Sequence, residues 1–484
     1  MKHFLKKILC WTLISNCFLM TAYAAPAWPA GPDIQAEAGV VIDMDSGAIL
    51  GGKAYDTPYP PASITKLLTA LLVLEHSKLD EMVTFSNSAV YNVESDSGNK
   101  LNVVEGDQLS VEDCLYSLLV HSCNQAANAL AEHVAGSQEA FVKMMNDKAA
   151  ALGCKDSHFD NPSGLNGDTQ YVTARDMAAI SRAAFAEPDI IRISAALKHT
   201  FPPTINNPEG LTIYAENKLI LNTNDSSSQY YYPPVKGGKT GYLLKAGNTL
   251  VTYAEKDGKR LISVILKGSP GQYYLDGKAL LEFGFEHFTN YNVAENESAY
   301  TEGEAAVDVG GKSYLPADLE IDPAGAVTLP EGAAFTDLEH TLVTDYPDEH
   351  PERSVAFIQY TYDGRKAGGA YLTQKEVQEP VTEPESQGET QPETDDKKEN
   401  GKKGFSINPF LIIALVVIAA AAGGGAYISY SRKKEEQQRA LRREQRRRRL
   451  REEGVTEEEF DRLLKERLGD RSKGKNQKKN KKTK

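Results

Sequence analysis

A helix that is apolar on most of its sides constrains this chain more than any other segment. Its apolar positions are Ile64, Leu67, Leu68, Leu71, Leu72 and Leu74. A surface helix keeps one polar face, and this segment lacks one, so other elements must enclose it. We therefore predict a buried helix that begins near residue 63.

A Ser-x-x-Lys motif stands at the start of this helix, directly after Pro61 and Ala62. Positions i and i+3 share a helix face, so we expect Lys66 to lie beside the Ser63 hydroxyl. A serine becomes a nucleophile when a base lies within hydrogen-bond reach, and a lysine that is neutral part of the time is such a base. Backbone N–H groups at a helix start also favour negative charge. The alternative is an N-cap serine followed by an exposed lysine.

A second motif, Ser122-Cys123-Asn124, lies between two predicted helices. The first helix is expected to begin at Ser110, and the second carries an apolar stripe from Ala126 to Val134. Ser122 and Asn124 then fall on a short connection, from which polar side chains can project into a cleft. A plain turn with a helix cap would explain them equally well if they stood alone. Cys123 has no identifiable partner base, and we interpret it as structural.

A third motif, Lys239-Thr240-Gly241, lies in the first of three predicted antiparallel strands. The apolar runs that predict these strands are Val235–Leu244, Asn248–Ala254 and Arg260–Leu266. Lys239 and Thr240 are expected on an edge strand, where Gly241 lets a substrate approach the backbone closely.

The order of the three motifs predicts an acylating serine enzyme, although no single motif is specific. Ser-x-x-Lys recurs at Ser97 to Lys100, Ser431 to Lys434 and Ser472 to Lys475, always in polar stretches. All three motifs in this order, each in a suitable local setting, rarely occur together by chance.

In these motifs the chain resembles the penicillin-recognising serine enzymes, and more narrowly the low-molecular-mass D-alanyl-D-alanine carboxypeptidases. The stretches that carry the resemblance are Pro61–Lys66, Asn161–Leu165, Thr173–Met177, Gly238–Tyr242 and Lys278–Leu281. The resemblance covers residues 33–290. It implies an α/β (α+β) fold, namely a β-lactamase/transpeptidase-like domain with an antiparallel sheet flanked by helices.

The resemblance also implies a role for each motif residue in acylation. Ser63 would attack the carbonyl of the penultimate D-alanine, and Lys66 would be the general base. Ser122 would relay a proton to the leaving amine, while Asn124 would hold the peptide amide. The product would be a peptidoglycan stem peptide one D-alanine shorter, and β-lactams would be inhibitors.

The strand motif is expected to bind the substrate. Lys239 and Thr240 would meet the terminal carboxylate beside Gly241. The backbone N–H groups of Ser63 and Tyr242 would form the oxyanion hole. No cofactor is implied, and the sequence has no His-Glu-x-x-His or Cys-x-x-Cys motif that would predict a metal.

Two departures from the family pattern stand out. Many relatives have histidine at the position of Ser163, so deacylation could differ here. Some relatives also have an arginine after the hairpin, whereas Gly268–Gly277 contains none. Carboxylate recognition would then rest on Thr240 and Lys239 alone.

Two other functions share these motifs. A class A β-lactamase needs a glutamate to activate the deacylating water, and the stretch from Asp156 to Gly167 has aspartates but no glutamate. A non-catalytic wall-sensing receptor would not need the motif residues, which are intact. Whether water or an amine accepts the acyl group depends on the shape of the cleft, so hydrolysis and transpeptidation both stay open.

The remaining segments predict where the enzyme works. We expect a signal peptide at 1–24, a small all-β domain at 291–374, an acidic disordered linker at 375–404, a transmembrane helix at 410–430 and a basic tail at 431–484.

The tail has twice as many Lys and Arg as Asp and Glu, which predicts that it is cytoplasmic. The catalytic domain would then lie outside a plasma membrane that the chain crosses once. The arginines near residue 446 are suited to anionic lipid, and no nucleic acid is expected as a partner. A protein partner of the tail is not identifiable.

Overall fold

The computed structural model describes residues 25–94, 97, 100–346 and 350–376. The predicted signal peptide, transmembrane helix and basic tail lie outside these residues, as does the linker from residue 377 onward. Within the described part of the chain, no helix has the length and hydropathy needed to cross a membrane.

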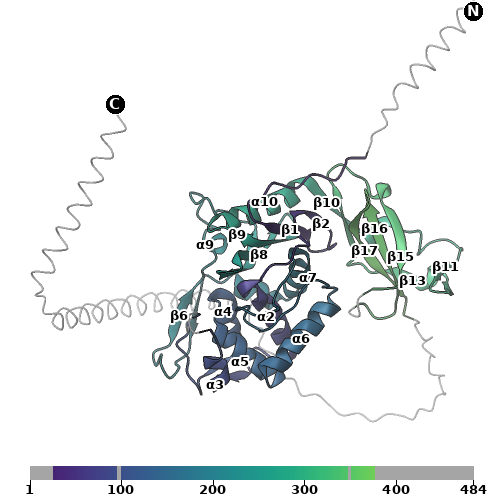
Figure 1. Cartoon of the computed structure of the whole chain (residues 1–484). Helices are drawn as coiled ribbons and strands as arrows, with labels where there is room; N and C mark the ends of the chain where they lie inside the picture. Colours follow the sequence, from purple (N-terminus) through teal and green to yellow (C-terminus); the bar gives the residue numbers. More distant parts are fainter. Residues whose placement is uncertain (1–24, 95–96, 98–99, 347–349, 377–484) are drawn as a thin grey trace, which may run out of the picture. The chain divides into compact units, whose positions relative to one another are not determined.

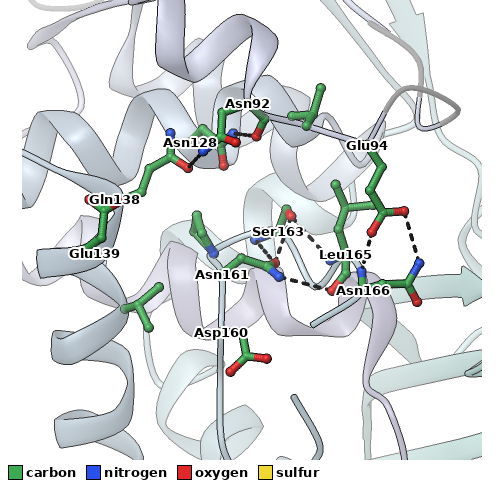
Figure 2. Close-up of a pocket in the computed structure, with 13 residues that line it drawn as sticks. Asn92, Glu94, Asn128, Gln138, Glu139, Asp160, Asn161, Ser163, Leu165 and Asn166 are labelled. Atoms are coloured by element: carbon green, nitrogen blue, oxygen red, sulfur yellow. Dashed lines mark hydrogen bonds between the residues drawn. The ribbon is translucent and has the colours of Figure 1, made fainter. Parts of the chain in front are cut away.

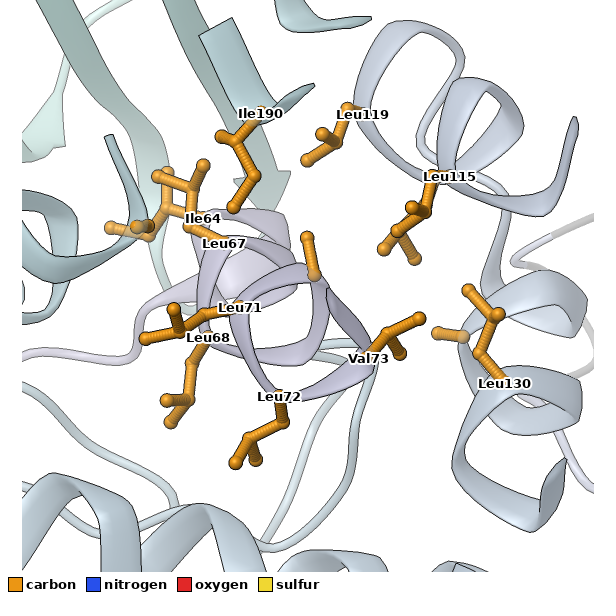
Figure 3. Packing of buried hydrophobic residues seen from close by; sticks show 14 of the residues in the cluster. Ile64, Leu67, Leu68, Leu71, Leu72, Val73, Leu115, Leu119, Leu130 and Ile190 are labelled. Atoms are coloured by element: carbon orange, nitrogen blue, oxygen red, sulfur yellow. The ribbon is translucent and has the colours of Figure 1, made fainter. Parts of the chain in front are cut away.

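The predicted buried helix is confirmed and lies among other helices (Figure 3). It is α2 (Lys66–His76), which follows a single 3₁₀ turn, η1 (Ala62–Thr65). Helices α4 (Val111–Val120), α5 (Asn124–Ala135) and α7 (Ala174–Ala184) pack around it. Its fully or almost fully buried apolar side chains are Leu67, Leu68, Ala70, Leu71, Leu72 and Val73. This enclosure fixes the position of the residues at its first turn.

The first sheet is antiparallel, with the strand order β2-β1-β9-β8-β7. Its strands are β1 (Ala38–Asp43), β2 (Ile49–Lys53), β7 (Val235–Leu243), β8 (Gly247–Lys256) and β9 (Lys259–Gly268). Asp257 and Gly258 join β8 to β9, and both have a positive φ, as a type I′ hairpin turn requires. The three predicted strands are confirmed, and β7 is an edge strand.

Both faces of this sheet are covered, which makes three layers (Figure 1). Helix α10 (Gln272–His287) packs on one face, and α7 packs on the other. Successive strand residues alternate between the two cores: Val41 lies in the core under α10, whereas Val40 and Ile42 lie in the core with α2. The combination of helices with an antiparallel sheet agrees with the predicted fold class.

Smaller elements lie between β2 and β7 in the sequence. They are β3 (Met82–Thr84), α3 (Asn87–Tyr91), β4 (Gln108–Ser110), α6 (Gln138–Ala151), α8 (Pro188–Ser194), β5 (Lys198–Phe201), β6 (Leu211–Tyr214) and α9 (Lys218–Leu221). Ser110 caps α4 as predicted, because its hydroxyl accepts a hydrogen bond from the Asp113 N–H.

A second antiparallel sheet follows α10. Its strands are β10 (Phe288–Asn292), β13 (Leu319–Ile321), β14 (Ala326–Pro330), β15 (Glu339–Val343), β16 (Ser354–Tyr362) and β17 (Arg365–Gln374). A separate hairpin pairs β11 (Val307–Val309) with β12 (Lys312–Tyr314), and short helical turns are α11 (Val293–Asn296), η2 (Pro316–Asp318) and η3 (Phe335–Asp337). Both sheets belong to one compact unit, so the division at residue 291 stays a prediction.

Candidate active site

Ser63 and Lys66 lie on one face of the turn that starts α2. Lys66 Nζ is 2.9 Å from Ser63 Oγ, and the Lys66 side chain is fully buried. Ala62, directly before the serine, has a φ of 51°, a left-handed conformation that costs an alanine free energy. The predicted pairing of serine and lysine is therefore present, within a turn held by the surrounding structure.

The surroundings of Lys66 favour a neutral amine. Burial lowers the pKa of Lys66 well below its usual value, and the positive charge of Lys239 lowers it further. The other two neighbours of Nζ are acceptors: Asn124 Oδ1 at 2.8 Å and the Ser163 carbonyl oxygen at 2.5 Å. A neutral amine donates its two N–H groups to these oxygens, which leaves its lone pair for the hydroxyl proton of Ser63.

Ser122 is joined to the strand motif by one hydrogen bond. Lys239 Nζ donates to Ser122 Oγ at 3.0 Å and to the Thr240 carbonyl at 2.7 Å. Ser122 has a φ of 59°, so its backbone is also left-handed. Burial lowers the pKa of Lys239 to about 7, and the positive charge of Lys100 contributes. The second and third motifs thus meet, as the sequence predicts.

The structure explains why position 241 is a glycine, and this explanation differs from the one that the sequence suggested. A Cβ at this position would lie 2.8 Å from Ser63 N and closer still to Thr249 Oγ1. Strand β7 therefore packs directly against the turn that carries Ser63. Thr249 Oγ1 also donates to the Pro61 carbonyl at 2.8 Å, which ties β8 to the same turn. The side chain of Tyr242, the next residue, is exposed.

The loop that contains Ser163 supplies a carbonyl oxygen, not a side chain, to the site. The Ser163 hydroxyl donates to Asn161 Oδ1 at 3.0 Å, so it is turned into its own loop (Figure 2). Asn161 Oδ1 also accepts from the Gly164 N–H at 2.8 Å. Gly164 has a φ of 81°, and a Cβ there would collide with the Ala62 carbonyl oxygen. The loop is thereby packed against the residue that precedes Ser63.

Two glutamates that the sequence analysis missed lie in the wall of the cleft. The cleft has a volume of about 550 Å³ and is lined by Ser63, Ser122, Asn124 and Thr240 together with Glu94 and Glu216. Both oxygens of Glu94 accept hydrogen bonds from Asn166, one from its backbone and one from its side chain (Figure 2). Both oxygens of Glu216 accept from Lys100. No local pattern marks these residues, because their partners lie far away in the chain.

The aspartates and the cysteine near the motifs have other roles. Asp160 accepts hydrogen bonds from the backbone and the hydroxyl of Thr169, which holds its loop together. Burial raises the pKa of the Cys123 thiol, so its reactive thiolate form is disfavoured. The structural interpretation of Cys123 agrees with this environment.

Known proteins resemble this chain over most of its described length. D-alanyl-D-alanine carboxypeptidase DacC of Escherichia coli is 32% identical over 324 residues, which is 65% of this chain and 76% of DacC. DacB2 of Mycobacterium tuberculosis is 36% identical over 271 residues, or 54% of this chain and 87% of DacB2. The structure of penicillin binding protein 5 from Haemophilus influenzae aligns with a TM-score of 0.56 at 28% identity, and covers 72% of this chain and 98% of that protein.

The chain also matches a whole protein family. Residues 24–269, about half of the chain, match the D-alanyl-D-alanine carboxypeptidase family. This segment contains all three motifs and the loop of Ser163. The chain therefore belongs to the D-alanyl-D-alanine carboxypeptidase family.

Proposed function

We propose that this serine-type D-alanyl-D-alanine carboxypeptidase uses Ser63 as its nucleophile and Lys66 as its general base. The enzyme removes the terminal D-alanine from peptidoglycan stem peptides through an acyl-enzyme, and β-lactams inhibit it. The observation that carries the assignment is the buried Lys66 amine, which lies 2.9 Å from Ser63 Oγ with its other neighbours already acting as acceptors.

Acylation begins when Ser63 Oγ attacks the carbonyl carbon of the penultimate D-alanine. The hydroxyl proton passes to the lone pair of Lys66, and the new C–O bond leaves negative charge on the carbonyl oxygen. The peptide C–N bond then breaks as Ser122 gives its proton to the leaving amine. Lys66 then returns a proton to Ser122 to replace the one that Ser122 gave away. The net result is an ester on Ser63 and a free D-alanine.

The substrate is expected to lie along the edge strand β7. An extended peptide can pair with an exposed strand edge, and β7 has no partner on that side in the described sheet. The close packing of Gly241 on Ser63 N brings the N–H groups of Ser63 and Tyr242 near one another, which supports their role as the oxyanion hole. Asn124 would hold the peptide amide, and Thr240 with Lys239 would receive the terminal carboxylate.

Deacylation reverses the proton transfer with water as the nucleophile. Water gives a proton to Lys66 as its oxygen attacks the carbonyl carbon of the ester. The bond to Ser63 Oγ then breaks, and Lys66 passes the proton on to Ser63. Ser163 contributes its carbonyl oxygen to Lys66 rather than its hydroxyl. We infer that water activation depends on Lys66, because both lining glutamates are engaged elsewhere: Glu94 accepts from Asn166, and Glu216 accepts from Lys100.

One experiment separates this function from the alternatives. The purified full-length chain is incubated with a peptide ending in D-Ala-D-Ala, and separately with a β-lactam, while free D-alanine and intact β-lactam are measured. We expect D-alanine release and little β-lactam destruction, both dependent on Ser63. Rapid β-lactam hydrolysis would identify a β-lactamase, and inactivity on both compounds would favour a wall-sensing receptor. Ser63→Ala is the control.

The cellular arrangement is a separate proposal. We propose that residues 410–430 span the plasma membrane, that the tail at 431–484 is cytoplasmic, and that residues 375–404 tether an external enzyme whose residues 291–374 form a small β domain. The length of the apolar segment and the basic composition of the tail support this. Protease added to cells stripped of their wall should digest the enzyme and spare the tail; a protected enzyme would contradict the proposal.

A further inference from the structure

Lys100 reaches the catalytic cleft from outside the three motifs. Its Nζ donates to Glu216 Oε1 at 2.9 Å and to Glu216 Oε2 at 3.2 Å. Both side chains are partly exposed, and both line the cleft beside Ser122 and Thr240. In the sequence, Lys100 is noticeable only as the end of a chance Ser-x-x-Lys match.

Lys100 is the one cationic side chain among the described residues that line the cleft. The motif lysine Lys239 lies behind this surface, almost fully buried, and donates to Ser122 Oγ and the Thr240 carbonyl. With a pKa of about 7, Lys239 is only partly charged at neutral pH. A substrate carboxylate that enters the cleft therefore meets a full positive charge only at Lys100.

The third titratable group at this position does not supply a charge. His121 Nδ1 lies 3.4 Å from Glu216 Oε1 but does not form a hydrogen bond with it. Burial lowers the pKa of His121, and Lys100 lowers it further, so the imidazole is neutral at pH 7. Lys100 is thus the partner that neutralises the charge of the Glu216 carboxylate. Glu216 already forms with Lys100 the ion pair that a substrate carboxylate would form.

We propose that Lys100 is a specificity-determining residue that binds the C-terminal carboxylate of the substrate, and that Glu216 positions Lys100 and competes with that carboxylate. The inference rests on the proposed carboxypeptidase function. It accounts for carboxylate recognition in a chain with no arginine between Gly268 and Gly277. Lys100 is added to Thr240 and Lys239 and does not replace them.

Two substrates with the same acyl group test the proposal. One is a stem peptide ending in D-Ala-D-Ala, and the other is the S-ethyl thioester of that peptide without its last residue, which has no carboxylate. Lys100→Met should lower kcat/KM for the peptide by about fivefold, mainly through KM, as expected for one ion pair at a partly exposed site. Its kcat/KM for the thioester should be unchanged, and Lys100→Arg should restore most of the loss on the peptide.

Glu216→Gln should act in the opposite direction, because it removes the competing carboxylate. We expect this variant to raise kcat/KM for the peptide relative to the thioester. Lys236→Met, which removes an exposed charge from the same strand as Lys239, is the matched control and should change neither value.

Equal losses on both substrates in Lys100→Met and Glu216→Gln would overturn the proposal, because they would indicate that the pair only holds the cleft wall in shape. Unchanged activity of Lys100→Met on the peptide would overturn it as well. Failure of the carboxypeptidase function itself is distinguishable, since the unmodified enzyme would then release no D-alanine.

Discussion

At the scale of residues, the proposed mechanism depends on two buried lysines with different tasks. Lys66 must be neutral to take a proton, and burial together with Lys239 lowers its pKa well below the usual value. Lys239 must be charged to bind a carboxylate, yet burial lowers its pKa to about 7. The proposed mechanism therefore requires a neutral Lys66 and a charged Lys239 at the same pH.

The resulting pH dependence has a definite sign. As pH falls through the pKa of Lys66, the base becomes protonated and kcat/KM falls. As pH rises through about 7, Lys239 loses its charge and kcat/KM for a carboxylate substrate falls again. We expect a bell-shaped profile for the D-Ala-D-Ala peptide, measured by D-alanine release. The thioester substrate should lack the alkaline decline, and an identical decline for both substrates would contradict the role of Lys239.

The sequence indicates the chemistry of these residues but not all of their partners. Ser63 and Lys66 are three positions apart, so helix geometry predicts their contact. Lys100 and Glu216 are 116 positions apart, and only the folded chain brings them together. The turned-in hydroxyl of Ser163 likewise depends on Asn161 and the packing of its loop, which no residue pattern specifies.

At the scale of elements, one strand and one turn must fit closely. Strand β7 packs on η1 where Gly241 meets Ser63 N, and β8 is tied to the same turn through Thr249. Short apolar runs predict β7, β8 and β9 with small errors at their ends, because these runs and an Asp-Gly turn determine the strands locally. The contact between β7 and η1 is a tertiary contact, so the sequence analysis assigned Gly241 to substrate approach instead.

Gly241→Ala tests this contact. The added Cβ would push β7 away from Ser63, so we expect D-alanine release to fall by at least about tenfold, the size of effect that misplaced catalytic groups produce. Gly258→Ala is the comparison: nothing lies within 4 Å of its Cβ, but its φ is 80°. That variant should lose about 1 kcal/mol of unfolding free energy and keep its activity. Full activity of Gly241→Ala would show that the contact is not needed.

At the scale of the whole molecule, a buried polar network joins the two sheets. Asn290 Nδ2 donates to Asp43 Oδ2 at 2.7 Å, and Ser46 Oγ lies 2.7 Å from Thr328 Oγ1. Asp43 is fully buried at the end of β1, and burial raises its pKa. The network therefore anchors the second sheet to a strand of the first one. Both sheets were expected from the sequence, but this link between them was not.

Asn290→Ala should weaken that link. It leaves Asp43 with one hydrogen bond fewer in a buried site, which costs about 1–3 kcal/mol of unfolding free energy. Urea denaturation measures this loss, and the exposed Asn296→Ala serves as the control. D-alanine release by the folded protein should be unchanged, because the network lies away from the cleft. An unfolding free energy equal to that of the control would contradict the anchoring role.

The central claim is that Ser63, activated by Lys66, forms the acyl-enzyme. The most direct measurement is the mass of the full-length chain after incubation with a β-lactam, followed by peptide mapping of the modified residue. We predict one covalent adduct per chain, on Ser63, that persists while D-Ala-D-Ala hydrolysis is blocked and is absent in Ser63→Ala. An adduct on another residue, or inhibition without any adduct, would contradict the claim.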